Sequence, residues 1–416
     1  MMEVKITVPG SKSVTQRAIA VAALADGASR LVGPLESEDT RLFRAALSRL
    51  GIMIEDADGS WMVHGQGGRI LPAGGELFMG NNGTGIRFLA SIVALGEGRY
   101  VLGGTERMAE RPIEPLLSAL RAWGAGAVSL RGTGCPPVAI EARGLEGGEV
   151  ALSANLSSQY LSSLLIVAPY ARKPARIRLD GPLVSRPYVD ITLSVMASFG
   201  IEAREEEGIF TVPRGIYQAR EYRIEGDASS ASYFWAGAAV TGGCVTVANI
   251  PQDALQGDAA FADILGLMGC SVEKGPDGVT VQGPKDGLTA IEIDMGKWPD
   301  VVPTLAVTAA FARGRTVIRN VAHLRIKETD RLRAVAVELG RLGADVSELP
   351  DGLVIEGGRK LHGGSIRTYD DHRIAMAFAV AGLRVPGVVI EDPGCVRKSF
   401  PEFWDLWSRI RPLSAG

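Results

Sequence analysis

A pattern that repeats about every 70 residues limits the folds open to this chain. Each copy has an amphipathic helix, a large apolar residue, a glycine and then two short alternating segments. The glycines that end these helices are Gly51, Gly124, Gly200, Gly269 and Gly343. Such periodicity is typical of a repeated supersecondary unit. We therefore expect six units, the last closing with a helix at residues 403–410, arranged as two similar α/β domains of three units each.

Turn signals inside the copies indicate where their strands join. Asp58-Gly59, Asp277-Gly278 and Asp351-Gly352 each separate two alternating segments. Asp-Gly is a favoured two-residue hairpin turn, so these positions predict antiparallel hairpins. A chain of 416 residues can bury two substantial cores. The seam between the two domains is expected between the segment 212–215 and Ile224.

Composition excludes several classes of function. A net charge of -3 argues against a nucleic acid or a polybasic membrane contact as partner. The apolar runs 18–25 and 88–95 are too short to cross a bilayer. The first residues lack a signal core, and the cysteines are scattered without metal-ligand spacing. We therefore expect a cytoplasmic protein with reduced thiols and no bound metal. The cysteines are Cys135, Cys244, Cys270 and Cys395.

The first strand-to-helix junction has the residues of an anion site. An alternating segment, residues 4–8, stops at Pro9-Gly10, and a small-residue apolar helix follows. Helix N-termini offer free N–H groups and a partial positive charge, to which side-chain cations and hydroxyls add. This pattern indicates a phosphate or carboxylate site, whereas the alternative is a capped surface helix with solvated cations. The polar residues of this junction are Ser11, Lys12, Ser13, Thr15, Gln16 and Arg17.

Two further junctions have a similar character. Residues 78–87 hold three glycines and two asparagines ahead of an apolar helix, so backbone N–H groups could approach an anion. This segment lacks the lysine of a nucleotide P-loop. Residues 323–333 crowd four cations around the start of a helix that Thr329 or Asp330 could cap. Cations there oppose the helix dipole, so an anion, or Glu328 with Asp330, must offset them. The alternative is a surface salt-bridge cluster. The four cations are Arg325, Lys327, Arg331 and Arg333.

Taken in order, these segments resemble the enolpyruvyl transferases, and within them the branch that acts on shikimate 3-phosphate. The motifs are PGSKS, GNNGTGIR, ERPI, SSQ, SRPY, EGDASSASYF, KETDR, DHR and RKSFP, spread over almost the whole chain. The resemblance implies two domains, each of three βαβαββ repeats in an inside-out α/β barrel, with a ligand cleft between them. It places residues 1–10 and 225–416 in one domain and residues 11–224 in the other.

The resemblance also implies a reaction of the shikimate pathway, on the route to chorismate and the aromatic amino acids. The enolpyruvyl group of phosphoenolpyruvate passes to the 5-hydroxyl of shikimate 3-phosphate, and phosphate leaves. Addition and elimination through a tetrahedral intermediate require a base, an acid and cations near the phosphate. We therefore expect a monomer that acts on small molecules, needs no cofactor and is inhibited by glyphosate at the phosphoenolpyruvate site.

Roles follow from the positions that match the family motifs. Asp300 matches the base, while Glu328 and Lys12 share the transfer of the methylene proton, and which of the two donates stays open. His372 completes the catalytic set. The residues expected to hold phosphoenolpyruvate are Lys12, Asn81, Gly83, Arg111, Gln159, Arg331, Arg373 and Lys398. Those expected to hold shikimate 3-phosphate are Ser13, Arg17, Ser157, Ser158, Ser185, Tyr188, Asp300 and Lys327.

The chain departs from the family pattern at three places. Thr15-Gln16 replaces Ser-Asn, His323 replaces Asn, and Phe88 replaces the frequent proline, which predicts weaker inhibition by glyphosate. The nearest rival activity is enolpyruvyl transfer to UDP-N-acetylglucosamine, which relies on a loop cysteine. The corresponding loop, residues 107–112, has no cysteine, and Cys135 comes later. A catalytically silent anion-binding protein is the alternative from a different class.

Overall fold

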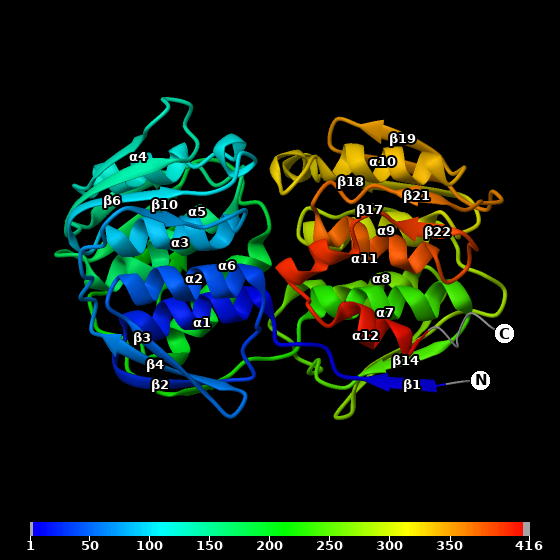
Figure 1. The fold of residues 1–416 in the computed structure, drawn as a ribbon, viewed down its shortest axis with the longest axis horizontal. Helices are drawn as coiled ribbons and strands as arrows, with labels where there is room; N and C mark the ends of the chain where they lie inside the picture. The colour runs from blue at the N-terminus through cyan, green and yellow to red at the C-terminus, as the bar shows by residue number, and fades with distance from the viewer. Residues whose placement is uncertain (1–2, 411–416) are drawn as a thin grey trace. The chain divides into compact units, whose positions relative to one another are not determined.

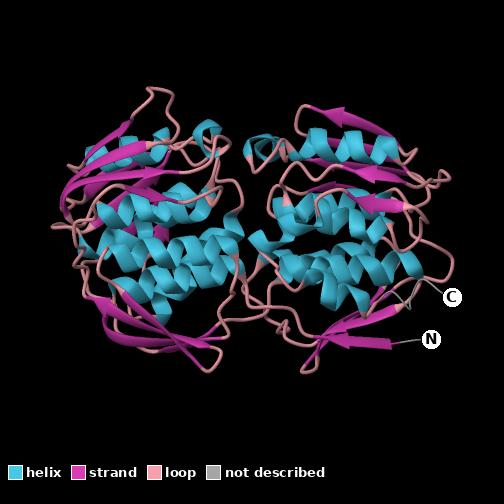
Figure 2. Ribbon diagram, viewed as in Figure 1, coloured by secondary structure: helices cyan, strands magenta, loops and turns pink. Residues whose placement is uncertain are grey.

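The computed structural model describes residues 3–410, and the chain divides into two compact units. We call Gly10–Ile224 the N-unit, and Met1–Pro9 together with Glu225–Gly416 the C-unit. Within each unit the helices pack together in the interior and the sheets cover them (Figures 1 and 2). The predicted α/β fold class, with helices inside and strands outside, is confirmed.

The N-unit has three four-stranded sheets, which cover its helices. Their strands are β2 (Asp26–Val32), β3 (Met53–Ala57), β4 (Ser60–Gln66), β5 (Glu76–Phe78), β6 (Glu97–Gly103), β7 (Gly126–Ser129), β8 (Val138–Arg143), β9 (Gly148–Leu152), β10 (Ala175–Leu179), β11 (Arg204–Glu206), β12 (Ile209–Val212) and β13 (Glu221–Arg223). The orders are β13-β2-β4-β3, β5-β6-β8-β7 and β9-β10-β12-β11. In each sheet the first two strands are parallel and a hairpin supplies the other two.

The C-unit repeats this arrangement, although its last sheet is shorter. Its strands are β1 (Glu3–Ile6), β14 (Cys244–Val247), β15 (Ser271–Gly275), β16 (Gly278–Gln282), β17 (Glu292–Asp294), β18 (Arg315–Arg319), β19 (Asp345–Leu349), β20 (Gly352–Glu356), β21 (Gly364–Ile366) and β22 (Val388–Ile390). The sheets are β1-β14-β16-β15, β17-β18-β20-β19 and β21-β22. The first strand therefore belongs to the C-unit, where β1 pairs in parallel with β14.

Helices alternate between central and peripheral positions in each unit. The helices are α1 (Lys12–Leu24), α2 (Glu38–Arg49), α3 (Gly83–Val93), α4 (Glu114–Ala122), α5 (Ser158–Val167), α6 (Arg186–Ser198), α7 (Ala228–Thr241), α8 (Phe261–Leu267), α9 (Val302–Ala309), α10 (Arg331–Arg341), α11 (His372–Ala381) and α12 (Phe403–Ser408). Every residue of α1 from Val14 onward, and every residue of α11, is buried. A helix that is apolar on all sides belongs in the interior, whereas α2 and α10 each bury one face.

Short 3₁₀ helices connect several of these elements. They are η1 (Met108–Glu110), η2 (Ala168–Tyr170), η3 (Gly257–Ala260), η4 (Pro299–Val301), η5 (Ala322–Ile326) and η6 (Pro393–Lys398). Three of them, η3, η4 and η5, lie close in sequence to the starts of α8, α9 and α10. Of these, η4 and η5 lead the chain to the N-termini of α9 and α10, where predicted site residues occur.

The predicted hairpins are confirmed. Asp58-Gly59 joins β3 to β4. The other two hairpins turn one residue earlier than predicted, at Pro276-Asp277 and Pro350-Asp351, because Gly278 and Gly352 are already the first residues of β16 and β20. Asp58 and Gly59 have φ angles of 47° and 71°, the positive values that a two-residue type I′ turn requires. The sixth repeat also has its predicted helix, α12, after β22.

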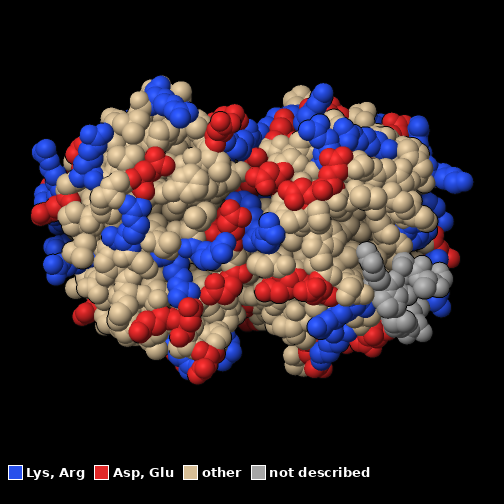
Figure 3. All heavy atoms as spheres, in the orientation of Figure 1, with Lys and Arg blue, Asp and Glu red and all other residues tan. Residues whose placement is uncertain are grey.

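Charged side chains of both signs are interspersed over the visible face of each unit (Figure 3). The cations considered below are therefore local clusters within a surface of mixed charge. Across residues 3–410, no helix combines the length and the apolar character that a bilayer crossing needs. All four cysteines are free thiols.

Candidate active site

The predicted site residues lie at helix N-termini and in the turns that precede them. Helix N-termini favour anions because their first N–H groups lack intrahelical partners and the helix dipole is positive there. Residues in the N-unit are Lys12, Ser13, Arg17, Asn81, Gly83, Arg111, Ser157, Ser158, Gln159, Ser185 and Tyr188; we call these the N-unit cluster. Residues in the C-unit are Asp300, Lys327, Glu328, Arg331, His372, Arg373 and Lys398; we call these the C-unit cluster.

Lys12 is held at the start of α1. Ser11 caps this helix, since its hydroxyl accepts a hydrogen bond from the backbone N–H of Val14. Lys12 Nζ lies 3.2 Å from Asp39 Oδ2, and both side chains are largely buried. Asn82 Nδ2 donates to the backbone carbonyl of Asp39 at 2.8 Å. The starts of α1, α2 and α3 therefore meet at Asp39, a residue that sequence analysis did not single out.

Helix α3 starts earlier than the sequence predicted. Residues 78–87 were expected to form a turn ahead of the helix, but α3 begins at Gly83. The reason is that Asn82 acts as the N-cap, with its Oδ1 accepting from the N–H of Gly85 at 2.8 Å. The prediction is therefore wrong for residues 83–87. It holds for Asn81 and the residues before it, which precede the helix.

Gly83 packs directly against two guanidinium groups. A Cβ atom added at Gly83 would lie 2.4 Å from Arg111 Nη2 and 2.8 Å from Arg87 Nη1. Arg111 Nη1 donates to both the backbone and side-chain oxygens of Asn81, each at 2.8 Å. Arg87 donates to the carbonyls of Gly83 and Pro112. Glycine therefore lets the first turn of α3 approach two cations. Arg87 was not assigned a role from the sequence, although it stands in the GNNGTGIR motif.

The start of α5 joins the same group. Ser157 caps α5, and its hydroxyl accepts from the N–H of Gln159 at 3.2 Å. Gln159 Nε2 donates to Thr84 Oγ1 at 2.9 Å, and Arg87 donates to Gln159 Oε1. Ser158, the first residue of the helix, is buried. Gln159 therefore connects the beginning of α5 to the beginning of α3.

Arg17 is a buried cation on the second turn of α1. Its Nε donates to Thr192 Oγ1 at 2.7 Å, and its Nη1 donates to the carbonyl of Ser13 at 2.9 Å. Its guanidinium carbon lies 5.3 Å from the centre of the Phe88 ring and 5.9 Å from that of Tyr188. Burial lowers the pKa of Arg17 to about 10, so the side chain stays cationic at neutral pH. Phe88, the departure from proline, thus supplies an aromatic face to Arg17.

Ser185 occupies a strained position before α6. It has φ 55° and ψ 44°, a left-handed conformation that costs a residue other than glycine about 1–3 kcal/mol. The N–H of Tyr188 donates to the carbonyl of Ser185 at 3.1 Å. Thr192, which accepts from Arg17, donates to the carbonyl of Tyr188 at 3.0 Å. The beginnings of α1 and α6 are therefore connected through one polar network.

In the C-unit, Asp300 is held between two guanidinium groups. It lies in η4, just before α9. Arg331 Nη1 donates to Asp300 Oδ1 at 3.1 Å, and Arg373 Nη2 donates to Asp300 Oδ2 at 2.7 Å. The Asp300 side chain is 19% exposed, whereas that of Arg331 is 2% exposed. Asp300 is therefore a carboxylate that bridges the starts of α10 and α11 and still reaches solvent.

Arg331 organises the C-unit cluster. Its Nε donates to Asp371 Oδ2 at 2.8 Å, and its Nη2 donates to Glu328 Oε2 at 2.8 Å. Burial disfavours its charge, yet the carboxylates of Asp371, Glu328 and Asp300 raise the pKa of Arg331 above its ordinary value. Three carboxylates from three segments therefore share one guanidinium. Asp371 belongs to the DHR motif but was not predicted as a partner.

Other cations of the segment 323–333 are offset by acidic residues. Arg325 Nη1 donates to Asp330 Oδ2 at 3.0 Å and to Glu348 Oε1 at 2.9 Å. Asp330 is the N-cap of α10, because its Oδ1 accepts from the N–H of Arg333 at 3.0 Å. Acidic residues therefore offset these cations, as one of the predicted alternatives requires, while the anion site stays a prediction. Arg325 belongs to a salt-bridge cluster, while Arg331 belongs to the candidate site.

The remaining C-unit residues lie near this centre. His372 is the first residue of α11 and is buried, with its Nδ1 3.8 Å from Asp371 Oδ1. Lys398 is buried at the end of η6. Lys327 directly follows η5 and lies near enough to His323 to affect its protonation.

We predict that His323 makes the fold sensitive to acid. Burial first, and then the charge of Lys327, lower the pKa of His323 from 6.5 to about 3. The unfolded chain therefore binds a proton at His323 in this window that the folded chain does not, so stability falls as the pH falls. Between pH ~6.5 and pH ~5 the wild type should lose about 2 kcal/mol more unfolding free energy than His323→Asn. Urea unfolding at both pH values measures this difference, and equal losses in the two proteins would contradict it.

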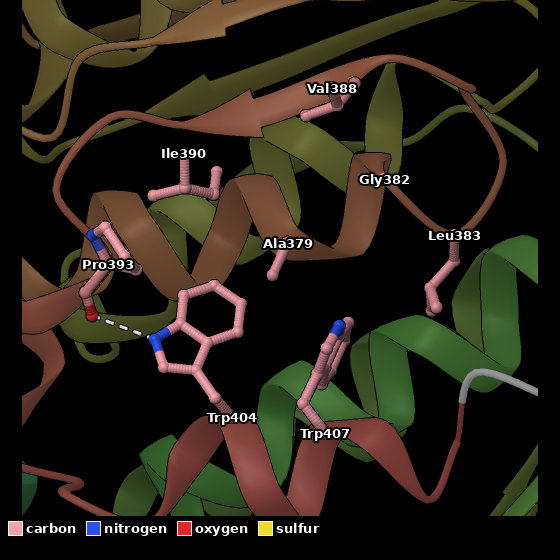
Figure 4. Close-up of a pocket in the computed structure, with 8 residues that line it drawn as sticks. All are labelled: Ala379, Gly382, Leu383, Val388, Ile390, Pro393, Trp404 and Trp407. Carbon is pink, nitrogen blue, oxygen red and sulfur yellow. Dashed lines mark hydrogen bonds between the residues drawn. The ribbon is translucent and has the colours of Figure 1, made fainter.

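One pocket of the C-unit lies apart from these residues. It has a volume of about 350 Å³ and is lined by Ala379, Gly382, Leu383, Val388, Ile390, Pro393, Trp404 and Trp407. The two indoles of α12 face α11 and β22 across it, and Trp404 Nε1 donates to the carbonyl of Pro393 at 2.8 Å (Figure 4). None of these eight residues is charged. The pocket therefore lacks the groups that a phosphorylated substrate needs.

Neither a metal centre nor a reactive thiol emerges from the described part of the chain. Across residues 3–410, His, Cys, Asp and Glu form no group of three or more that could hold a metal ion. Cys135 is buried, and burial raises the pKa of its thiol. A thiol with a raised pKa is a poor nucleophile at neutral pH. This observation weighs against the rival activity that relies on a cysteine.

Comparisons with known proteins show the family of the chain. A family model described as EPSP synthase (3-phosphoshikimate 1-carboxyvinyltransferase) matches residues 1–407. The chain is 46% identical over 415 residues to the 3-phosphoshikimate 1-carboxyvinyltransferase of Sulfurovum sp., covering 98% of this chain and 97% of that protein. It is 45% identical over 407 residues to the protein of that name from Nostoc punctiforme, covering 97% and 95%. The solved structure of EPSP synthase from Acinetobacter baumannii superposes with a TM-score of 0.80 at 30% identity, covering 98% of this chain and 95% of that chain. The chain therefore belongs to the EPSP synthase family.

Proposed function

We propose that this protein is a 3-phosphoshikimate 1-carboxyvinyltransferase. It transfers the enolpyruvyl group of phosphoenolpyruvate to the 5-hydroxyl of shikimate 3-phosphate and releases phosphate. The observation that carries the proposal is the position of Asp300, a partly exposed carboxylate held by Arg331 and Arg373. Glu328 lies on the same guanidinium, with its Oε2 2.8 Å from Arg331 Nη2. Two carboxylates and two cations of the C-unit thus supply the acid, the base and the anion partners that the reaction needs.

The proposed roles follow from these contacts. Asp300 takes the proton of the attacking hydroxyl, and Glu328 or Lys12 gives a proton to the methylene carbon of phosphoenolpyruvate. The tetrahedral intermediate then loses that carbon proton and expels phosphate. His372 supports the catalytic set from its buried position beside the Asp371 carboxylate.

The other members of the two clusters bind the substrates. The proposed phosphoenolpyruvate ligands are Lys12, Asn81, Gly83, Arg111, Gln159, Arg331, Arg373 and Lys398, with Arg87 added from its contacts with Gly83 and Gln159. The proposed shikimate 3-phosphate ligands are Ser13, Arg17, Ser157, Ser158, Ser185, Tyr188, Asp300 and Lys327. The enzyme is proposed to act as a cytoplasmic monomer without a cofactor.

Phosphate release tests the function directly. The purified protein is given phosphoenolpyruvate with shikimate 3-phosphate, with UDP-N-acetylglucosamine, or alone, and inorganic phosphate is measured. Release that requires shikimate 3-phosphate is expected. Release with the UDP-sugar would favour the rival transferase, and the absence of release in all three mixtures would favour an anion-binding protein without activity.

Lys12→Met should lose activity and phosphoenolpyruvate affinity together. Lys12 sits beside Asp39 at an N-terminus that favours anions, so its charge acts on both the bound substrate and the transition state. We expect kcat to fall by ~10²-fold or more and KM for phosphoenolpyruvate to rise by ~10-fold. Steady-state kinetics with each substrate varied in turn measures both values. A loss restricted to shikimate 3-phosphate affinity would contradict this placement.

Gly83→Ala should weaken inhibition by glyphosate more than it weakens the binding of phosphoenolpyruvate. The added Cβ would lie 2.4 Å from Arg111 Nη2, so the Arg111 guanidinium has to move. We expect glyphosate to inhibit the wild type at the phosphoenolpyruvate site. In the variant the inhibition constant should rise by ~10-fold or more, and KM for phosphoenolpyruvate by less, since a displaced guanidinium affects the longer ligand more. Gly98→Ala, in β6, is a poor control because its φ is 96°, whereas Gly340→Ala, on α10 with open space around it, is suitable. Unchanged inhibition in Gly83→Ala would separate this turn from the inhibitor site.

A further inference from the structure

A buried carboxyl group that has no role in the proposed mechanism lies behind Asp300. Asp258 belongs to η3, which packs against the start of α7, and its residue is only 3% exposed. The hydroxyl of Ser229, on the first turn of α7, donates a hydrogen bond to Asp258 Oδ2. Nothing in the local sequence, LQGDAA, indicated a functional residue here. The connection becomes visible only through the fold.

Ser229 links this carboxyl to the C-unit cluster. Arg373 Nη2 lies 3.5 Å from Ser229 Oγ, a long contact, and 2.7 Å from Asp300 Oδ2. One terminal nitrogen of Arg373 therefore faces both the serine and the proposed base. Because the Ser229 proton is directed to Asp258, the lone pairs of its oxygen are left to face Arg373. Asp258, Ser229, Arg373 and Asp300 thus form a single row of contacts.

The charges around Asp258 favour its neutral form. Two buried guanidinium groups, Arg331 and Arg373, form ion pairs with three carboxylates, those of Asp300, Glu328 and Asp371. A negative charge on Asp258 would be a fourth one beside two cations, so it is poorly compensated. Burial first, and then the charge of Asp300, raise the pKa of Asp258 to about 7, while Arg373 and the Ser229 hydrogen bond act in the opposite direction.

The other elements that pack on η3 add few charges. From the start of α7, Asp227 also disfavours an ionised Asp258. On α8, Asp263 is exposed and pairs with Lys274 on β15 instead. Burial therefore has the largest effect on the protonation of Asp258, and Asp300 and Arg373 are the charged neighbours that affect it most.

We propose that Asp258 is a positioning residue: through Ser229 it orients Arg373 toward Asp300, and its neutral form is the one that lets Arg373 bind an anionic substrate. This inference rests on the proposed function. When Asp258 ionises, its negative charge partly compensates the positive charge of Arg373. The C-unit cluster then attracts phosphoenolpyruvate less strongly. When Ser229 is lost, the guanidinium keeps its charge but loses one of the contacts that orient it.

Three variants separate these effects. Asp258→Asn keeps an oxygen that accepts from Ser229 and removes the ionisation. Ser229→Ala removes the link and keeps the buried carboxyl. Ser232→Ala is the matched control, because Ser232 is a buried serine one turn further along α7 that donates to the carbonyl of Ser229. Steady-state kinetics is measured from pH ~6 to pH ~8.5, with phosphoenolpyruvate varied at saturating shikimate 3-phosphate.

The expected results concern differences from the wild type, so that the titration of the substrates themselves cancels. Over this pH range KM for phosphoenolpyruvate should rise by about 5- to 10-fold more in the wild type than in Asp258→Asn. The kcat of Asp258→Asn should stay within ~3-fold of the wild type at pH ~6. Ser229→Ala should lose ~10-fold in kcat, and Ser232→Ala should behave as the wild type.

A second measurement does not depend on turnover. In protein with ¹³C-labelled aspartate carboxyl groups, one signal should titrate near neutral pH and disappear in Asp258→Asn. If every carboxyl signal titrates below pH ~5, or if Asp258→Asn keeps the pH dependence of the wild type, the proposal is wrong. If Ser229→Ala and Ser232→Ala give the same kcat, the positioning role is wrong. A wild type that releases no phosphate would refute the proposed function instead, and the carboxyl titration would still decide the state of Asp258.

Discussion

Asp300→Asn should lower kcat by ~10²–10⁴-fold while leaving the fold intact. Asparagine fills the same space, and its single oxygen accepts from one of the two guanidinium groups that now bind separate oxygens of Asp300, but it cannot take the proton of the attacking hydroxyl. Arg331 keeps Asp371 and Glu328 as partners, so the charge of its buried guanidinium stays compensated. The loss should therefore appear in kcat measured at saturating substrates, with little change in the urea midpoint.

Two further variants complete this experiment: Glu328→Gln, and Asp263→Asn as a control away from the candidate site. Glu328→Gln should show a loss of the same order if Glu328 donates the methylene proton, and a smaller one if Lys12 does. Asp263→Asn is the control, because Asp263 is an exposed carboxylate of the same unit that pairs with Lys274. A rate near that of the wild type in both Asp300→Asn and Glu328→Gln would remove these two residues from the mechanism.

Arg331→Met should have the largest effect on stability. Methionine fills much of the space of arginine but leaves the carboxylates of Asp371, Glu328 and Asp300 without their shared cation. Removing one partner of a buried ion pair costs about 3–5 kcal/mol, because the remaining charges are buried and uncompensated. Urea unfolding at neutral pH should show a loss of that size. Activity should be lost as well, since Arg331 is also a proposed ligand of phosphoenolpyruvate.

The pH dependence gives Arg331→Met a second readout. Without the guanidinium, the carboxylates in the folded variant should have raised pKa values, so the folded chain binds more protons than the unfolded one. This proton uptake stabilises the variant relative to the wild type as the pH falls toward ~5, so its deficit against the wild type shrinks. Arg333→Met, two positions along on the exposed face of α10, should match the wild type at both pH values. A deficit that does not depend on pH would indicate lost packing rather than unpaired charge.

The parts of the fold that sequence predicted depend on local chemistry. Asp58-Gly59 specifies a hairpin because the turn conformation is set by those two residues themselves. The small apolar residues after Pro9-Gly10 likewise predicted the helix α1, and the structure buries it from Val14 onward because each of its faces meets other apolar surface. The start of α3 was missed because the cap, Asn82, lay within a glycine-rich segment that could also be a loop.

The contacts within the candidate site depended on tertiary structure. Asp39 meets Lys12 from a different helix, and Asp258 meets Arg373 only through Ser229. No spacing in the sequence relates these residues, because each contact joins separate helices or segments that only the packing of the fold brings together. Family motifs located most of the cations together with Asp300 and Glu328, but Asp39 and Asp371 as their further carboxylate partners had to come from the structure. The assigned roles of the site residues stay predictions until the variants are measured.

One edge strand of each unit, β1 in the C-unit and β13 in the N-unit, is far in sequence from the strand it pairs with. This separation affects the order in which the protein can fold during translation. β1 emerges first, yet its neighbour β14 begins at Cys244, and β2 receives its parallel neighbour β13 only at Glu221–Arg223. A ribosome that has made the first two hundred residues has therefore completed neither outer sheet. The N-unit sheet gains β13 at Glu221–Arg223, and the C-unit sheet is completed by β16, so the stretch that completes both sheets runs over residues 221–282. Pairings this distant in sequence form slowly. The nascent chain therefore exposes unpaired strand edges, to which chaperones can bind, until that stretch has left the exit tunnel.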